Sequence, residues 1–169
     1  MTTAQTGASL AGCAIAILIL FANLRKWWTG GRALKDLLPT IQGFITGAFG
    51  TVCSGGLVGW LAGCTRQGAN AGGSKAVSAT TGTETGGEIP AASMGSLTEE
   101  GAVIVFLLFC ALVLAYKAAS KEDKGRMTGA LVAGFILCAT AGVAGALHGL
   151  PDLANSIGLS GRNALRGAL

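Results

Sequence analysis

The sequence predicts an all-α integral membrane protein with four transmembrane helices, and three observations lead to that prediction. Hydrophobic residues make up 51% of the 169 residues and charged residues only 12%, whereas charged residues make up about 25% of an ordinary soluble domain. Four apolar stretches are candidates to cross the roughly 30 Å hydrocarbon core of a bilayer as helices. Most of the basic residues lie in two connections between those stretches. A lipid environment accounts for all three observations.

Prolines and charged residues mark the ends of the four apolar stretches. These stretches cover residues 8–24, 41–64, 102–116 and 128–147. Pro39 precedes the second stretch, where proline suits the start of a helix, and Pro151 follows the fourth, where proline stops one. The first stretch has the length of a signal-peptide core. However, no lysine or arginine precedes it, and a signal peptide carries positive charge there. We therefore expect an anchor with its N-terminus outside the cell.

Basic residues are most frequent in two short connections, at residues 25–40 and 117–127. Together these hold eight of the twelve lysines and arginines of the chain: Arg25, Lys26, Arg32, Lys35, Lys117, Lys121, Lys124 and Arg126. Connections rich in lysine and arginine stay in the cytoplasm. Because four spans place both connections on the same side of the membrane, we expect both in the cytoplasm and both termini in the exoplasmic space.

The spans divide the chain into two pairs. Residues 1–64 form the first transmembrane pair, and residues 99–148 form the second. Residues 65–98 between them are mainly Gly, Ala, Ser and Thr, with little large apolar surface to bury, so we expect a flexible exoplasmic linker. Residues 149–169 form a C-terminal tail, either a short amphipathic helix on the membrane surface or a tail without contacts.

Small residues recur at every fourth position of the second span, namely at Gly43, Gly47, Thr51, Gly55, Gly59 and Gly63. A weaker series in the fourth span includes Gly134, Cys138 and Gly142. Small residues four positions apart let two helices approach closely in lipid, where the hydrophobic effect between helices is weak. Four residues turn about 400° around a helix, so one straight partner cannot contact the whole series. We expect the fourth span to contact one part, and another helix of the chain or a second copy of the protein to contact the rest.

Residues 61–64 read LAGC, the form of a bacterial lipobox, at which a lipoprotein precursor is lipidated on cysteine and cleaved. Cleavage there would discard the first span and the basic connection after it, and Gly63 already belongs to the small-residue series. We therefore interpret Cys64 as a small residue at a helix end. No CxxC pair and no neighbouring histidine accompany the five cysteines, so we expect neither a zinc site nor a disulfide framework.

No Asp, Glu, Lys, Arg or His lies in the central part of any span. Pumps and ion-coupled transporters place such groups inside the membrane, because their chemistry requires them there. His148 is the only histidine and lies at the outer end of the fourth span, and no set of partners for a nucleophilic serine accompanies it. We expect no enzyme, no cofactor and no direct nucleic-acid binding. The expected partners are the lipid bilayer of the bacterial cell membrane and either further copies of the chain or other membrane subunits.

The Ala-, Gly- and Thr-rich layout with four spans resembles the small membrane "spread" proteins encoded by conjugative plasmids of actinomycetes. This resemblance covers the whole chain in size, composition and layout, and it implies an accessory role beside a DNA translocase. Residues 102–147, two apolar spans around the connection KAASKEDKGR, are similar to the hairpin of conjugative pilins, which implies a structural subunit of a filament. The two preceding spans depart from the pilin pattern. A third hypothesis is a pore former of the phage holin class, whose small-residue series would serve oligomeric holes.

Overall fold

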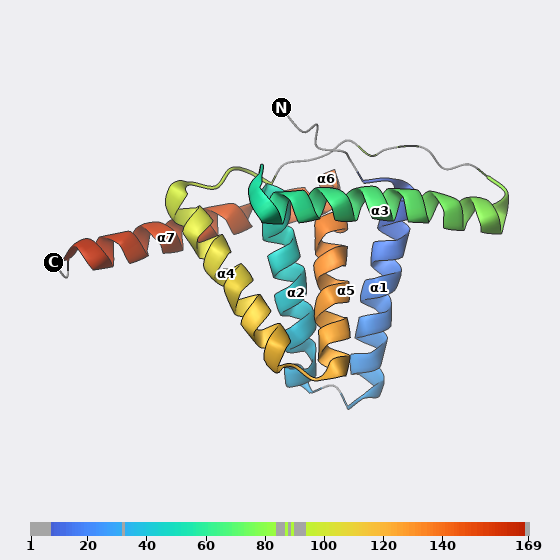
Figure 1. Ribbon diagram of the computed structural model, residues 1–169, viewed down its shortest axis with the longest axis horizontal. Coiled ribbons are helices and arrows are strands. Elements are labelled where there is room, and N and C mark those ends of the chain that lie inside the picture. The colour runs from blue at the N-terminus through green and yellow to red at the C-terminus, as the bar shows by residue number, and fades with distance from the viewer. Residues whose placement is uncertain (1–7, 32, 84–86, 88, 90–93, 168–169) are drawn as a thin grey trace.

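The computed structural model describes residues 8–31, 33–83, 87, 89 and 94–167. The described residues form helices and no strand: α1 (Leu10–Thr29), α2 (Leu34–Val52), α3 (Gly56–Thr81), α4 (Glu99–Ala118), α5 (Lys121–Leu137), α6 (Ala141–Ala146) and α7 (Gly149–Gly167). The expected all-helical class is confirmed. Helices α1, α2 and α5 run side by side, α4 is tilted against them, and α3 and α7 lie across the upper end of this bundle (Figure 1).

Hydroxyl side chains determine where three of the helices begin. The Ser9 hydroxyl accepts a hydrogen bond from the Gly12 N–H over 3.0 Å, and the Thr98 hydroxyl accepts one from the Gly101 N–H over 3.2 Å. Ser120 accepts from the Asp123 N–H in the same way. Each hydroxyl satisfies an N–H group that the first turn of its helix leaves without a partner. The starts of α1, α4 and α5 are therefore fixed locally.

The core lies where α5 packs against α1 and α2. Ala133 and Ile136 of α5 are fully buried together with Ala16 of α1. A neighbouring cluster joins Phe49 of α2 to Val105 of α4. Most of the buried side chains are small, so the helix backbones approach one another closely, as in membrane bundles.

The second expected span is divided by a bend. α2 ends at Val52, α3 begins at Gly56, and the two helices meet at 102°. Gly56 has a φ of +69°, a left-handed conformation that costs any residue with a β-carbon about 1–2 kcal/mol. Ser54, Gly55 and Gly56 thus form a corner that no helix continues through. The expectation of one helix over residues 41–64 is wrong.

The second half of α3 occupies much of the expected linker. Residues 65–81 are helical, and Gly73 packs directly on the backbone of Ala11, which holds this part of α3 against α1. Gly82, with a φ of +69°, ends the helix as a left-handed cap. A flexible linker is therefore the wrong description of residues 65–81. Residues 84–86, 88 and 90–93 of that segment lie outside the described residues.

The fourth expected span also has different bounds. α5 covers Lys121–Leu137, so it includes the charged residues 121–126, and the chain leaves the helix at Cys138 instead of continuing to residue 147. By length and composition, two helices are able to cross a membrane, α1 and α4, or three if α2 and α3 together form one broken span. The expected C-terminal tail is helical as α7.

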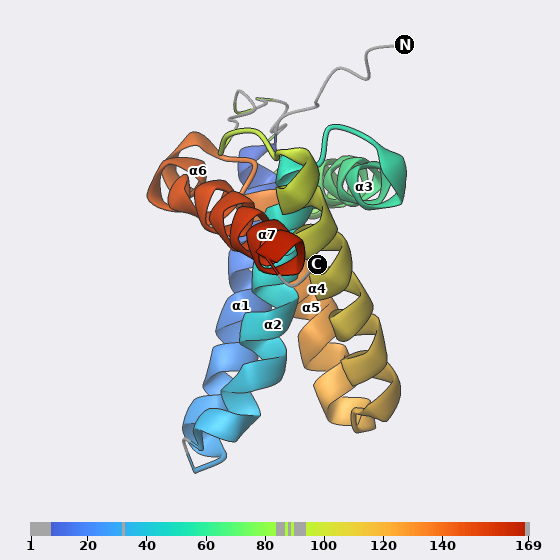
Figure 2. The same ribbon diagram turned by 90° about the vertical axis from the view of Figure 1, so that its left-hand side faces the viewer.

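The two ends of the bundle differ in character. The α1–α2 and α4–α5 connections are both at the lower end, whereas α3, α6 and α7 lie at the upper end (Figure 1). In the perpendicular view, α3 and α6 lie on opposite sides of the upper end (Figure 2). Both connections that the sequence marks as basic are therefore at one end of the fold.

Candidate functional site

Side chains of α1 and α5 and a backbone carbonyl of α2 are bonded to one another at the lower end of the bundle. Glu122 carries an oxygen 3.6 Å from the ammonium group of Lys26 and 3.1 Å from a guanidinium nitrogen of Arg126. The other terminal nitrogen of Arg126 donates to the backbone carbonyl of Asp36 over 3.1 Å. Asn23 of α1 donates to the backbone carbonyl of Arg126 over 3.5 Å. We call Lys26, Glu122 and Arg126, with the Asp36 carbonyl, the basic-end cluster.

The basic residues expected to set the topology lie in helix ends more than in loops. Arg25 and Lys26 belong to α1, Lys35 to α2, Lys117 to α4, and Lys121, Lys124 and Arg126 to α5. Arg32 lies outside the described residues. At this end α1, α2 and α5 run one or two turns past the expected span ends, and α4 runs two residues past its own. Long cationic side chains can lie along such a helix and still reach water with their charged heads.

Three of the predicted small residues form a close contact between α2 and α5. A β-carbon built at Gly47 would lie 3.0 Å from the α-carbon of Gly134, and one built at Gly134 would lie 2.6 Å from the Phe44 carbonyl oxygen. A β-carbon at Gly43 would collide with the Met127 carbonyl. We call Gly43, Gly47 and Gly134 the α2–α5 seam. Only residues without a β-carbon allow this approach of the two backbones.

The other predicted small residues lie elsewhere. Thr51 donates its hydroxyl to the Ala48 carbonyl of its own helix over 2.7 Å, and a β-carbon at Gly59 would lie 2.6 Å from the Cys53 carbonyl oxygen, at the α2–α3 corner. Cys138 is fully buried beyond the end of α5. A β-carbon at any of three further glycines would meet no atom of the described residues within 4 Å: Gly55, Gly63 and Gly142. The bend after α2 turns the later members of the series away from α5.

Two asparagines hold α3 and α7 against the upper end. Asn70 of α3 accepts a hydrogen bond from the Ser9 N–H over 2.8 Å. Asn155 of α7 accepts from the Thr98 N–H over 3.0 Å and donates to the Ser96 carbonyl over 3.2 Å. Sequence analysis did not single out these residues, because their partners lie 57 or more positions away along the chain and no local spacing signals such a contact.

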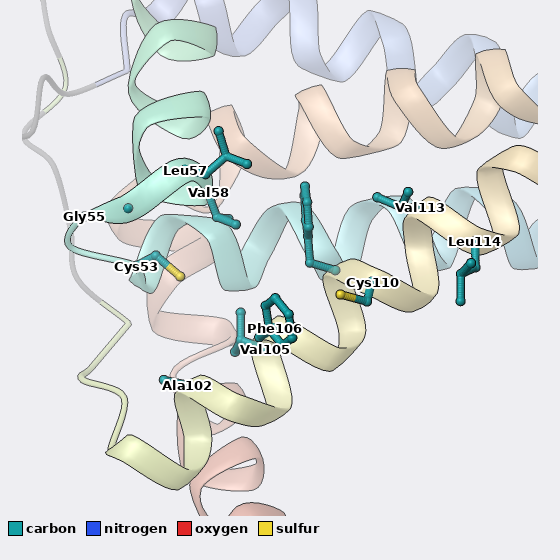
Figure 3. Close-up of a pocket in the computed structure, with 12 residues that line it drawn as sticks. Cys53, Gly55, Leu57, Val58, Ala102, Val105, Phe106, Cys110, Val113 and Leu114 are labelled. Carbon is teal, nitrogen blue, oxygen red and sulfur yellow. The ribbon is translucent and has the colours of Figure 1, made fainter.

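An apolar groove follows the inner side of α4. Its upper part, of about 590 Å³, lies between α4 and the α2–α3 corner, with Cys53 and Leu57 on one side and Phe106 on the other (Figure 3). Its lower part, of about 340 Å³, lies between α4 and α5. Phe109 and Val113 line both parts, so that the two parts adjoin at these residues. We call the whole the α4 groove.

Large apolar side chains are also exposed on α1 and α4, and those on α4 include residues at the rim of the α4 groove. Leu18 and Phe21 on α1, and Phe106 and Leu114 on α4, are each about two-thirds exposed. Contiguous apolar surface of this kind marks a contact with lipid or with another protein.

Within the described residues, no group of three or more His, Cys, Asp or Glu side chains is arranged to hold a metal ion. Comparisons with known protein families, with curated proteins and with solved structures give no match to this chain.

Proposed function

We propose that this chain is a multi-pass protein of the bacterial cell membrane that acts, without catalysis of its own, as a component of a membrane assembly for conjugative DNA transfer. The observation that carries the membrane placement is the basic-end cluster. Lys26 of α1 and Arg126 of α5 share Glu122, so the basic ends of both helix pairs are fixed on one side. The positive-inside rule assigns that side to the cytoplasm.

In this proposal α1, α2, α4 and α5 cross the bilayer, and α3 and α7 lie at its outer surface. α2 and α5 have shorter apolar runs than α1 and α4, and their place in the bundle compensates for this. α5 buries Ala130 and Ala133 against its neighbours, so protein rather than lipid surrounds much of it. Polar positions are tolerated on helix faces that are turned toward the bundle interior.

α7 has the pattern of a helix that lies in the membrane interface. Leu153 and Ile157, one turn apart, are about half exposed. Arg162 and Arg166 lie on the opposite face by helical geometry, and Arg162 is paired with Glu100 of α4. A helix with one apolar and one cationic face binds at the boundary between headgroups and acyl chains. Both termini would then lie in the exoplasmic space.

The DNA-transfer role is the most specific part of the proposal and comes from the resemblance to plasmid spread proteins in size, composition and layout. The exposed apolar face of α1, with Leu18 and Phe21, supplies a surface for further copies of the chain or for other membrane subunits. Contact through such a face would let the protein organise an assembly without catalysis of its own.

Reporter fusions test the membrane placement. Green fluorescent protein fused after Gly30 or Ala119 is expected to fluoresce, because it folds in the cytoplasm. Alkaline phosphatase fused after Gly82 or Gly167 is expected to be active, because it needs the exoplasmic space. Phosphatase activity after Gly30 or Ala119 would contradict the placement of the basic end.

Deletion of the gene tests the role. We expect reduced spread of the plasmid among recipient cells without loss of the first transfer, and restoration when the full chain is supplied in trans. Unchanged spread would contradict the DNA-transfer role. Loss of a surface filament would instead select the pilin alternative, and collapse of the membrane potential when the chain is expressed alone would select the pore former.

A further inference from the structure

We propose that the α4 groove binds one anionic phospholipid, with an acyl chain lying along the groove and the phosphate beside Lys117 and Lys124. This inference rests on the membrane placement proposed above and adds a specific partner to it. Three properties of the groove support it: its length and apolar walls, its volume, and the position of its cations.

The groove has the length and the lining that an acyl chain requires. The stretch of α4 from Ala102 to Tyr116 advances about 21 Å, which exceeds half of the roughly 30 Å hydrocarbon core. Val105 and Leu112 are almost completely buried at its floor, while Leu57 and Phe106 at its rim are about two-thirds exposed. The groove is therefore apolar within and open toward the lipid.

The volume of the groove suits an acyl chain better than a second helix. A helix with its side chains is about 10–12 Å across, whereas the two parts of the groove, about 590 and 340 Å³, are in the size range of sites for small molecules. α4 is held in place by α2, where Val105 packs beside Phe49, and by α7, where Asn155 contacts Gly101. A chain of methylene groups is thinner than a helix and would require less displacement of α4.

Cations lie where the groove reaches the basic end. Lys117 lines the lower part, and the ammonium group of Lys124 lies 5.7 Å from the centre of the Tyr116 ring beside it. Glu122 and Asp123, the carboxylates of this end on α5, pair with Lys26 and Arg126. Within the part of the chain that the structure describes, no carboxylate forms an ion pair with Lys117 or Lys124. Both lysines thus remain available to a phosphate.

The other end of the groove offers no comparable attraction. The residues that line the upper part are apolar or glycine, with no charged side chain among them. The headgroup of an anionic lipid therefore belongs at the lower end, in the cytoplasmic leaflet of the proposed placement. Anionic lipids attract basic residues of that leaflet.

Native mass spectrometry of the full chain in mild detergent tests the inference. Phosphatidylglycerol and phosphatidylcholine with identical acyl chains are titrated separately, and we expect one phosphatidylglycerol to bind with the higher affinity. Lys117→Gln combined with Lys124→Gln should lower that affinity about 25-fold, at about fivefold for each lysine, and leave phosphatidylcholine unchanged. Val113→Trp, at the junction of the two parts, should abolish the binding of both lipids.

Two matched variants serve as controls. Arg25→Gln combined with Lys35→Gln removes the same charge from the opposite side of the basic end, and Leu18→Trp adds the same indole to the outer face of α1. Both should bind phosphatidylglycerol as the unmodified chain does. If Val113→Trp does not fold, the lysine variant still decides the question, because its changes lie at helix surfaces.

Three results would overturn the inference. The first is a phosphatidylglycerol preference that survives the double lysine substitution. The second is unchanged lipid binding by a folded Val113→Trp variant. The third is a second protein chain cross-linked at residue 113 in place of lipid, which would assign the groove to a contact between copies. Other measurements test the proposals on which this inference rests. The reporter fusions would show a wrong membrane placement, and the spread of the plasmid would show a wrong DNA-transfer role.

Discussion

Gly47 of α2 and Gly134 of α5 face each other so closely that a β-carbon on either would lie 3.0 Å from the α-carbon of the other. Behind them, the same β-carbons would press on the carbonyls of Leu131 and Phe44. Backbone atoms on both sides cannot rotate away as a side chain would. The distance between α2 and α5 is therefore set by the absence of a side chain in glycine at positions 47 and 134.

Gly47→Ala should destabilise the bundle, because α2 and α5 would have to separate to admit one methyl group. Overpacking of this kind costs about 1–3 kcal/mol. Gly63→Ala is the control, since a β-carbon there meets no described atom within 4 Å and alanine favours a helix over glycine by about 1 kcal/mol. Unfolding of the two purified variants in detergent, followed by circular dichroism, measures the difference. A Gly47→Ala variant as stable as the unmodified chain would show that the seam does not fix the helix distance.

The sequence could predict helix class, the basic end and the candidate seam residues, because each depends on a local pattern. Hydropathy identified the apolar stretches, and a spacing of four identified Gly43 and Gly47. The same spacing also suggested that Gly55, Gly59 and Gly63 continue one helix. It took no account of Ser54, Gly55 and Gly56, where a positive φ at Gly56 turns the chain.

What the sequence could not show depends on contacts between distant segments. Residues 65–81 have few large apolar side chains, so they were expected to be a linker, yet α3 packs on α1 through Gly73 and buries Arg66, whose Nε donates to the Ala62 carbonyl over 3.2 Å. When small residues make the contacts, the sequence shows no periodic pattern of large hydrophobic residues that would predict a packed helix. The α4 groove likewise exists only because α4 is tilted against α2 and α5.

Gly73→Ala should lift α3 from α1, whereas Gly72→Ala should not. A β-carbon at Gly73 would lie 2.7 Å from the carbonyl carbon of Ala11 and 2.9 Å from the backbone nitrogen of Gly12, while one at Gly72 would meet no described atom within 4 Å. The neighbouring substitution gains about 0.5–1 kcal/mol from the helix preference of alanine. Amide hydrogen exchange across residues 56–81 should therefore accelerate in Gly73→Ala and slow in Gly72→Ala. Equal exchange in both variants would contradict the close packing of α3.

Asn155→Ala should release α7 from the start of α4. The substitution removes the hydrogen bonds to the Thr98 N–H and the Ser96 carbonyl, and it leaves those groups to find water instead. A net loss of about 1.4 kcal/mol corresponds to about tenfold faster exchange of the α7 amides. Asn163→Ala, at an exposed position of the same helix, is the control and should not accelerate exchange, because alanine favours a helix over asparagine. If both substitutions accelerate exchange equally, Asn155 does not hold α7.

Arg126→Lys should separate the two contributions that the basic-end cluster combines, charge and geometry. Lysine keeps the positive charge, so the reporter fusions should give the same topology. It has a single nitrogen, however, and cannot reach both the Asp36 carbonyl and Glu122 as the two terminal nitrogens of Arg126 do. The side chain of Arg126 is only 13% exposed. We therefore expect the free energy of unfolding in detergent to fall by about 1–2 kcal/mol, and the loss to persist in high salt.

Lys26→Gln is the comparison. That lysine also pairs with Glu122, but it is 62% exposed, so its replacement should lower the free energy of unfolding by less than about 0.5 kcal/mol at physiological salt. Equal losses in the two variants would mean that the cluster acts through charge alone and that the bond to the Asp36 carbonyl contributes nothing to stability.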